Sequence, residues 1–170
     1  MPEISGKIER KYMAHYFDSA FNADTTGTPV WYRIGEDLEE YNIELNPDTE
    51  ITKNILGNTK FTHSGYEPSA DADPFYARTG DALFEKLQEI VDERHTGDQL
   101  KTSALEVHLW EAASGAQGGY VAYRQFCYLT PTSYGGDTSG YQIPFSVSYV
   151  GDRIKGTFTP DAATGGGTFA

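Results

Sequence analysis

The sequence predicts a mainly β fold with one α-helix, in an α+β arrangement, and three observations support this. The chain contains 12 Tyr and 18 Gly, and such residues favour strands and turns. Apolar and polar residues alternate in most segments, as they do in strands that bury one face. Only the segment 79–97 has apolar residues at helical spacing. We therefore expect many strands in a single domain that spans residues 1–170.

The first residues, about 1–15, are predicted to form a polar N-terminal arm. Residues 1–11 read MPEISGKIERK and lack the apolar run of a signal peptide. No stretch of the chain approaches the roughly 20 apolar residues that cross a membrane as a helix. Cys127 is the single cysteine, which excludes an intrachain disulfide and a cysteine zinc cluster. We expect a soluble protein that is made in the cytosol.

An acidic stretch, GEDLEEYNIELNPDTE, occupies residues 35–50 and contains no Lys or Arg. Its alternation predicts a strand. The residues predicted to point into the core are Tyr41, Ile43 and Leu45. The residues predicted to point into solvent are Glu40, Asn42 and Glu44. Residues 46–48 (NPD) predict a turn and residues 49–56 a second strand, so we expect a hairpin with one carboxylate-lined face.

The next segment, residues 62–78, reads THSGYEPSADADPFYAR and is predicted to be a long irregular loop. Pro68 and Pro74 interrupt it, and no periodic pattern runs through it. Loops of this length in a compact domain usually serve a function or bind a partner.

One amphipathic helix is predicted at about residues 80–95. Its apolar stripe consists of Leu83, Phe84, Leu87, Ile90 and Val91. Asp81 is placed to cap the start of the helix, and Gly97 to end it in a left-handed conformation. Arg94 and His95 lie in the last turn, where the helix dipole favours positive charge. We expect the helix to cover a sheet.

Three strands are predicted in the C-terminal half, at residues 103–111, 119–129 and 141–150. The first and third alternate, with Leu105, Val107 and Leu109 on one face of the first and Glu106, His108 and Trp110 on the other. The second is apolar or aromatic on both faces, which predicts a strand covered on both sides. Pro144 predicts an edge position or a bulge.

The C-terminal end follows a predicted tight hairpin turn at Gly151 and Asp152, which leads into a further strand. Residues 165–167 are three consecutive glycines. We therefore expect a flexible C-terminal tail over about residues 160–170.

No catalytic or metal-binding pattern emerges from the sequence. The four histidines, His15, His63, His95 and His108, are scattered and do not have zinc-site spacing. Asp71 and Asp73 lack the remaining positions of a calcium loop. Cys127 lies in an aromatic strand and is expected to be an inert buried thiol. We expect no cofactor and no metal.

Four other function classes are judged from composition and side chains. The net charge of −12 argues against nucleic-acid binding and against binding to an anionic membrane. Glu40 and Glu106 are formally available as a glycosidase pair, although any acidic protein offers such pairs. Trp31, Trp110 and Tyr120 would form a sugar-binding platform if they were exposed together, or would fill an interface.

Three ordered features resemble a known family. They are the run NPDTEITKNILG at residues 46–57, the segment GYEPSADADPFY at residues 65–76, and the single helix that follows. Together they resemble the major tail protein, the tail tube subunit, of long-tailed bacteriophages that infect Gram-positive bacteria. The later strands fit this family by pattern alone.

The resemblance implies a β-sandwich or small barrel with one flanking helix, and a structural protein instead of an enzyme. It implies six subunits in a ring, with stacked rings forming a tube through which DNA is ejected. The implied partners are further copies of the chain, a tape measure protein, and tail terminator or tip proteins. The implied location is the virion, with assembly in the host cytoplasm. Tube proteins of contractile tails, tail-like bacteriocins and type VI secretion systems are similar and remain alternatives.

The resemblance also implies roles for particular residues. A negatively charged wall facing the lumen is expected from Glu40, Asn42 and Glu44, because DNA must slide past without adhering. The alternative is that these acids coat an outer surface and confer solubility. Contacts between rings are expected from the loop residues Gly65, Tyr66, Glu67, Pro68, Asp71, Asp73 and Pro74.

Overall fold

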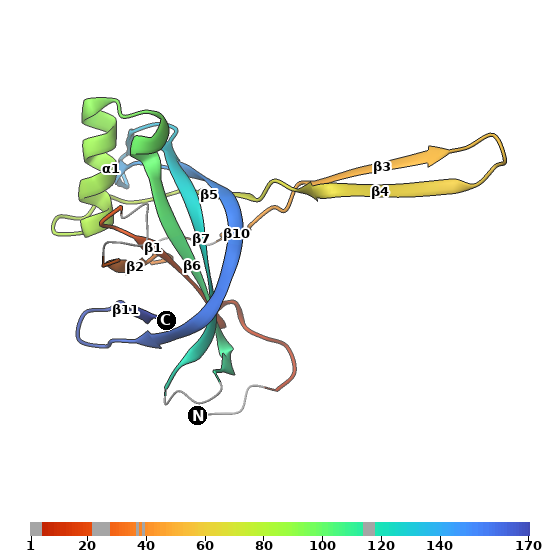
Figure 1. The fold of residues 1–170 in the computed structure, drawn as a ribbon. Coiled ribbons are helices and arrows are strands. Elements are labelled where there is room, and N and C mark those ends of the chain that lie inside the picture. Colours follow the sequence, from red (N-terminus) through yellow and green to blue (C-terminus); the bar gives the residue numbers. More distant parts are fainter. Residues whose placement is uncertain (1–4, 22–27, 37, 39, 114–117) are drawn as a thin grey trace.

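The computed structural model describes residues 5–21, 28–36, 38, 40–113 and 118–170, and it has a mainly β architecture (Figure 1). The strands are β1 Met13–Asp18, β2 Trp31–Arg33, β3 Pro47–Lys53, β4 Thr59–Tyr66, β5 Ser69–Ala72, β6 Lys101–Ala112, β7 Tyr120–Pro131, β8 Gly135–Asp137, β9 Gly140–Gln142, β10 Phe145–Pro160 and β11 Gly167–Phe169. The helices are α1 Ala82–Glu93 and two 3-10 helices, η1 Arg10–Tyr12 and η2 Gly97–Leu100. None of these helices is long and apolar enough to cross a membrane.

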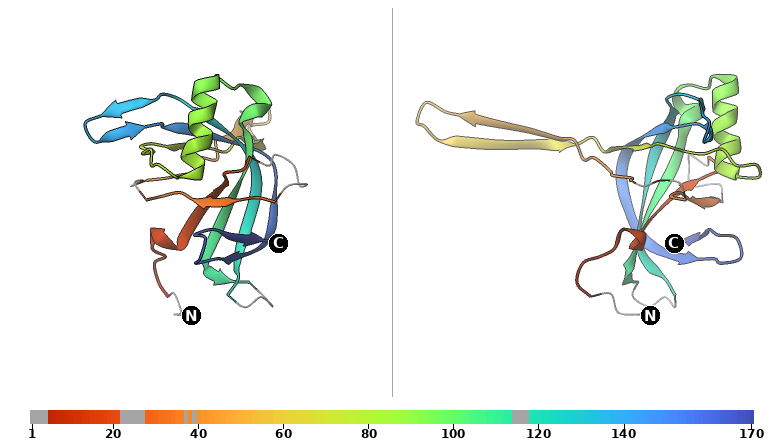
Figure 2. Two further views of the ribbon diagram at one scale, coloured as in Figure 1. Left: turned by 90° about the vertical axis from the view of Figure 1, so that its left-hand side faces the viewer. Right: turned by 180° about the vertical axis from the view of Figure 1, so that it is seen from behind.

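The body is a seven-stranded antiparallel sheet that curls into a nearly closed barrel. Its strand order is β11-β10-β7-β6-β1-β2, and β5 pairs with the first part of β10. β10 is strongly curved, and β7 pairs with it along almost the whole length of β10 (Figures 1 and 2). The two ends of the sheet approach each other beside β11, where a Cβ on Gly166 would lie 2.6 Å from the carbonyl oxygen of Trp31. A mainly β fold with one α-helix among the described residues confirms the predicted fold class.

Apolar side chains are buried on both faces of the sheet. On one face, α1 and the neighbouring loops cover a large cluster that includes Phe17, Leu129 and Phe145. On the other face, a smaller cluster includes Leu105, Val107 and Phe158. β7 lies between β6 and β10 and contributes to both clusters. The prediction of a strand covered on both sides is therefore correct in part, because the middle residues 123–126 of β7 are only partly buried.

The helix begins where the sequence predicts and ends earlier. Asp81 is the N-cap residue, but its side chain accepts a hydrogen bond from the Tyr32 hydroxyl at 2.7 Å and caps no backbone N–H. Arg94, and not Gly97, adopts the left-handed conformation that ends the helix, with φ of 51°. The Arg94 guanidinium donates to the Tyr134 hydroxyl at 3.0 Å, which anchors this strained residue. Gly97 instead opens the 3-10 helix η2.

The predicted turn at Gly151 and Asp152 is wrong, because β10 continues through both residues. The register with β7 shifts between Val150 and Ile154, which makes this segment a β-bulge. Gly151 has φ of +73°, a conformation that suits both a tight turn and a bulge. A glycine at this position is therefore compatible with a tight turn and with a β-bulge, and the sequence alone does not distinguish them.

The chain ends are more regular than predicted. The arm predicted over residues 1–15 is shorter, because Met13 already begins β1 and pairs with His108 of β6. The C-terminal residues predicted to be flexible form β11, whose Phe169 pairs with Phe158 of β10. Glycine is needed there because Gly167 lies against the Phe158 ring and leaves no room for a side chain.

The largest difference from the sequence prediction is the position of the acidic hairpin. Residues 40–45 form only one bridge, between Glu44 and Ser69, Asn46 is left-handed with φ of 44°, and Pro47 and Asp48 already belong to β3 instead of the predicted turn. The hairpin instead consists of β3 and β4, and its turn lies at residues 54–58. The predicted loop 62–78 is also wrong in its first half, because it contains the end of β4 and all of β5.

Candidate assembly surface

The β3–β4 hairpin projects from the body as an isolated ribbon (Figures 1 and 2). It forms a two-stranded sheet of its own and pairs with no strand of the main sheet. Every residue of β3 is exposed, and so is every residue of β4 except Gly65. A two-stranded hairpin alone in water is at best marginally stable. Its two open edges are also free to pair with another chain.

One face of the hairpin, called its apolar face below, carries two large exposed apolar side chains. Ile51 lies opposite Phe61, Thr49 opposite His63 and Lys53 opposite Thr59, so these six side chains share a face, and its apolar part is Ile51 and Phe61. The His63 ring extends the row, with its centroid 4.5 Å from that of Tyr66. Ile51 is 70% exposed and Phe61 is 62% exposed. The opposite face is polar and consists of Glu50, Thr52, Lys60 and Thr62. The hairpin is therefore amphipathic and has no described partner for its apolar face.

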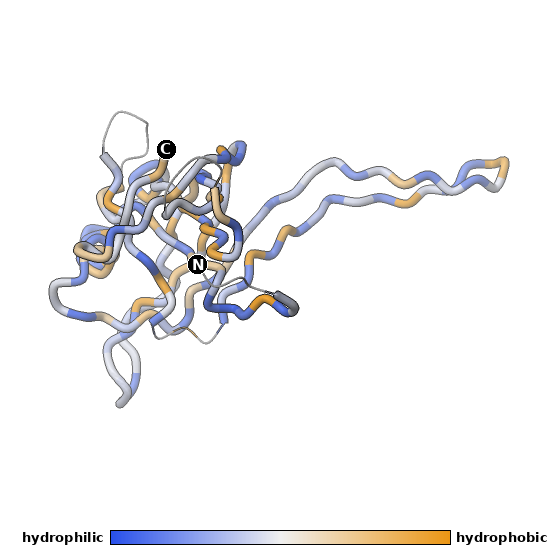
Figure 3. The backbone as a smooth tube through the Cα atoms, turned by 90° about the horizontal axis from the view of Figure 1, so that it is seen from below, coloured by the Kyte–Doolittle hydropathy of each residue, from blue (hydrophilic) through white to orange (hydrophobic). Residues whose placement is uncertain are grey.

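The tip of the hairpin is also apolar and carries positive charge. Ile55 is 103% exposed and Leu56 is 79% exposed. The turn is held by the Asn54 side chain, whose Oδ1 accepts the backbone N–H groups of Leu56 and Asn58, both at 3.0 Å. Figure 3 shows the hydrophobic residues at this far end of the ribbon. The eight residues 53–60, KNILGNTK, contain two lysines and no acid.

An acidic groove lies at the root of the hairpin. It has a volume of about 230 Å³, and its polar side chains are Glu40, Asn42, Glu44, Ser69, Asp71 and Asp73. Two backbone hydrogen bonds hold its walls together, from the Glu44 N–H to the Ser69 carbonyl at 2.7 Å and back at 2.9 Å. The structure thus brings the predicted wall residues together with two carboxylates of the predicted inter-ring segment. The role of each remains a prediction.

The other residues predicted for inter-ring contact lie nearby along the chain. Gly65 and Tyr66 end β4, and the Glu67 N–H donates to the Leu45 carbonyl at 3.1 Å. Pro68 lines a cavity beside the groove, and Pro74 follows Asp73 through a cis peptide bond. Gly65 to Pro68 therefore lie at the base of the hairpin, whereas Pro74 lies in the irregular segment after β5.

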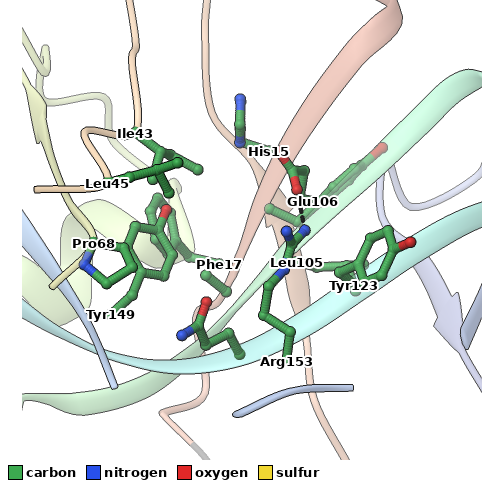
Figure 4. Close-up of a pocket in the computed structure, with 13 residues that line it drawn as sticks. His15, Phe17, Ile43, Leu45, Pro68, Leu105, Glu106, Tyr123, Tyr149 and Arg153 are labelled. Carbon is green, nitrogen blue, oxygen red and sulfur yellow. Dashed lines mark hydrogen bonds and ion pairs between the residues drawn. The ribbon is translucent and has the colours of Figure 1, made fainter. Parts of the chain in front are cut away.

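A mostly apolar cavity of about 210 Å³ lies on the other side of the same root (Figure 4). Ile43, Leu45 and Pro68 form the wall nearest the hairpin, and Phe17 and Leu105 belong to the sheet. Its rim is polar, because Glu106 is ion-paired with Arg153 and the Arg153 guanidinium lies 4.2 Å from the centre of the Tyr123 ring. Extended residues 40–45 therefore separate an acidic groove from an apolar cavity.

The alternation predicted for residues 40–45 is correct even though the strand is not. Tyr41 is buried and Ile43 is partly buried, whereas Glu40, Asn42 and Glu44 are exposed. Leu45 is the exception, because it is 53% exposed although predicted to be in the core. It lines the open cavity instead.

His15 lies buried between this cavity and the N-terminal arm. Its Nε2 accepts a hydrogen bond from the Arg10 guanidinium at 3.0 Å, and its ring centroid lies 4.7 Å from that of Tyr41. The pKa of His15 is lowered to about 3, mainly by burial and to a smaller extent by the positive charges of Arg10 and Arg33, with His108 contributing least. His15 is therefore neutral in the folded protein at any pH above about 4.

Replacing His15 with glutamine is expected to reduce the acid sensitivity of the fold. Below pH 6.5, the ordinary pKa of the His15 side chain, His15 becomes protonated in the unfolded state but stays neutral in the folded state. Unfolding therefore becomes easier by about 1.4 kcal/mol for each pH unit as the pH falls towards 3, and this histidine has no effect above pH 6.5. Glutamine retains an acceptor for Arg10 without titrating.

Urea unfolding at pH 7, 6, 5 and 4 measures this effect as the difference between the unchanged protein and His15→Gln. We expect the two free energies of unfolding to converge or cross as the pH falls. Parallel pH curves for the two proteins would contradict the assigned burial and charge environment of His15.

The alternatives weighed from the sequence find little support in the placement of their residues. Trp31 is 5% exposed and lies in the smaller core cluster, with Tyr120 packed against that cluster. Trp110 stacks instead on His108, with ring centroids 4.5 Å apart. The three do not form one exposed platform. Glu106 lines the apolar cavity and Glu40 the acidic groove.

No metal or nucleophile site emerges from the described part of the chain. Within residues 5–21, 28–36, 38, 40–113 and 118–170, no group of three or more His, Cys, Asp or Glu side chains is arranged to hold a metal ion. Cys127 is fully buried, and burial raises the pKa of its thiol well above the ordinary value. The thiol is therefore protonated and unreactive at neutral pH.

Comparison with known proteins adds no identification. No protein-family model matches the chain, and no curated protein matches it. The hairpin, the groove and the cavity at its root are thus the features from which a function can be argued.

Proposed function

We propose that this protein is a structural subunit that assembles with copies of itself into stacked hexameric rings, forming the tail tube of a bacteriophage. The observation that carries the proposal is the projecting β3–β4 hairpin, whose apolar face meets no other described part of the chain. Exposed apolar patches on soluble proteins mark interaction sites. The hairpin runs through residues 46–57, which are among those that resemble major tail proteins.

The proposal explains several further features. A curled sheet with edge strands β2, β5 and β11 offers backbone groups that neighbouring subunits can pair with in a ring. A chain with 25 acidic and 13 basic residues presents few cations to DNA phosphates, which is what a conduit requires. In this proposal a tape measure protein and tail terminator or tip proteins are the other partners, and the assembled protein belongs to the virion. A tube protein of a contractile tail, a tail-like bacteriocin or a secretion system would use the same assembly.

Sedimentation velocity over a wide concentration range, combined with negative-stain electron microscopy, tests the proposal. We expect monomers at low concentration that convert into rings and tubes as concentration and incubation time increase, because each weak contact is repeated around the ring and along the stack.

Two other results would replace the proposal. A protein that stays monomeric at every concentration and temperature, and binds a glycan tightly on an array, would be a carbohydrate-binding module. Glycan hydrolysis that disappears in Glu106→Gln would identify an enzyme.

A further inference from the structure

The tip and the root of the hairpin have complementary chemistry. The tip presents Ile55 and Leu56, which are almost fully exposed, between Lys53 and Lys60. The root presents an apolar cavity on one side of residues 40–45 and an acidic groove on the other. An aliphatic side chain flanked by positive charges is what these two adjoining sites together would accommodate.

The sizes are compatible with this pairing. The cavity holds about 210 Å³, whereas an engineered apolar cavity of about 150 Å³ in another protein is large enough to bind benzene. One leucine or isoleucine side chain is of comparable size to benzene. Figure 4 shows the aliphatic side chains of Ile43 and Leu45 at one end of the cavity, away from the ion pair of Glu106 and Arg153.

The charged groups at both ends form no ion pairs among the described residues, although the Asn42 amide donates a hydrogen bond to the Glu40 carboxylate. In the described residues, Lys53 and Lys60 form no ion pair, and neither do Glu40 and Glu44. The protein as a whole has a net charge of −12, so two copies repel each other in general. A contact that places the two lysines of the tip against the carboxylates of the groove removes repulsion where the copies are closest.

The tip of a hairpin cannot reach the cavity and the groove at the root of the same hairpin. β3 contains seven residues and at roughly 3.3 Å per residue it separates the tip from the root by about 23 Å. The ribbon also points away from the body (Figures 1 and 2). The tip and the root are different surfaces, so a contact between them joins copies head to tail and propagates into rings or filaments.

We infer that the hairpin tip of one copy docks at the hairpin root of a second copy, with Ile55 or Leu56 in the apolar cavity and Lys53 and Lys60 against the acidic groove. This inference rests on the proposed self-assembly and names the surface that mediates it. It assigns Glu40 and Glu44 to a contact between subunits, in place of the lumen wall expected from the sequence.

Paired charge reversals test the inference. Lys53→Glu with Lys60→Glu, and Glu40→Lys with Glu44→Lys, are each expected to abolish assembly at concentrations where the unchanged protein is fully assembled. All four residues are exposed, so both variants are expected to remain folded, which circular dichroism checks. Mixing the two variants is expected to restore assembly, because each reversed tip then meets a reversed groove. The quadruple variant, whose net charge equals that of the unchanged protein, is also expected to assemble.

A matched control separates a local effect from net charge. Glu89→Lys with Glu93→Lys on the exposed side of α1 changes the net charge as much as the groove variant does, and is expected to assemble normally. Failure of this control, or failure of the mixture, would overturn the inference. So would a closed dimer as the largest species of the unchanged protein.

The same experiment also tests the alternative that Glu40 and Glu44 face the lumen of the tube. A groove variant that assembles like the unchanged protein would overturn the docking contact and return Glu40 and Glu44 to the lumen wall. Unchanged protein that never assembles would instead contradict the proposed function itself, so the two failures are distinguishable.

Discussion

Replacing Ile51 and Phe61 with aspartate is expected to abolish assembly while leaving the monomer folded and equally stable. The two side chains face each other on the apolar side of the hairpin and are mostly exposed in the monomer. Little apolar burial is therefore lost from the folded monomer. In an assembly that covers this face, each side chain would contribute about 1.5–3 kcal/mol. Losing both weakens each contact by roughly two to four orders of magnitude.

Sedimentation velocity and electron microscopy measure the loss, and thermal unfolding of the monomer checks the fold. The matched control is Thr52→Ala with Thr62→Ala on the polar face of the same strands, which is expected to assemble. Tubes formed by the aspartate variant at the usual concentration would show that the apolar face is not an assembly contact.

Replacing Phe145 with alanine is expected to cause the largest loss of monomer stability, about 3–5 kcal/mol. Phe145 is 1% exposed, and its ring lies edge-on to those of Phe17 and Phe75 at centroid distances of 5.9 and 5.4 Å. The three rings join β10, β1 and the segment that leads to α1. Truncation therefore removes burial, two aromatic contacts and the filling of the main core at once.

Phe61→Ala makes the same chemical change on the exposed hairpin and serves as the control. We expect it to change the free energy of unfolding by no more than about 0.5 kcal/mol. Urea unfolding at concentrations where the protein is monomeric measures both variants. Equal losses for the two substitutions would contradict the assignment of Phe145 to the core and Phe61 to an uncovered surface.

Periodicity predicted the elements that pack against the core. Leu83, Leu87 and Ile90 of the predicted stripe are buried on the inner side of α1 as expected, with Phe84 partly buried. β7 contributes residues to both core clusters. These patterns are informative because burial selects apolar residues at the spacing of the element.

The position of the hairpin is predicted wrongly because its alternating apolar residues are not buried against the rest of the chain. Ile51 and Phe61 alternate with polar residues as core strand residues do, although nothing in the described chain covers them. Alternation reports that a face is apolar and does not report which molecule covers it. The available local signal was the turn at Asn54, Gly57 and Asn58, whose residue types favour such turns.

Long-range pairing explains the remaining errors. Ser69–Ala72 is too short and polar to predict as a strand, and it is ordered by pairing with β10, which lies more than 70 residues later in the chain. The acidic groove depends on the same contact, because Glu44 reaches Asp71 and Asp73 only through the bridge to Ser69. No local pattern encodes that proximity.

The central claim is that this chain builds a tube from copies of itself, and cryo-electron microscopy of the concentrated, unaltered protein tests it most directly. The account predicts stacked rings of six subunits around an open lumen, with each β3–β4 hairpin seated on a neighbouring copy. A reconstruction or particle set that contains only separate monomers, with the hairpin exposed at every concentration, would contradict it.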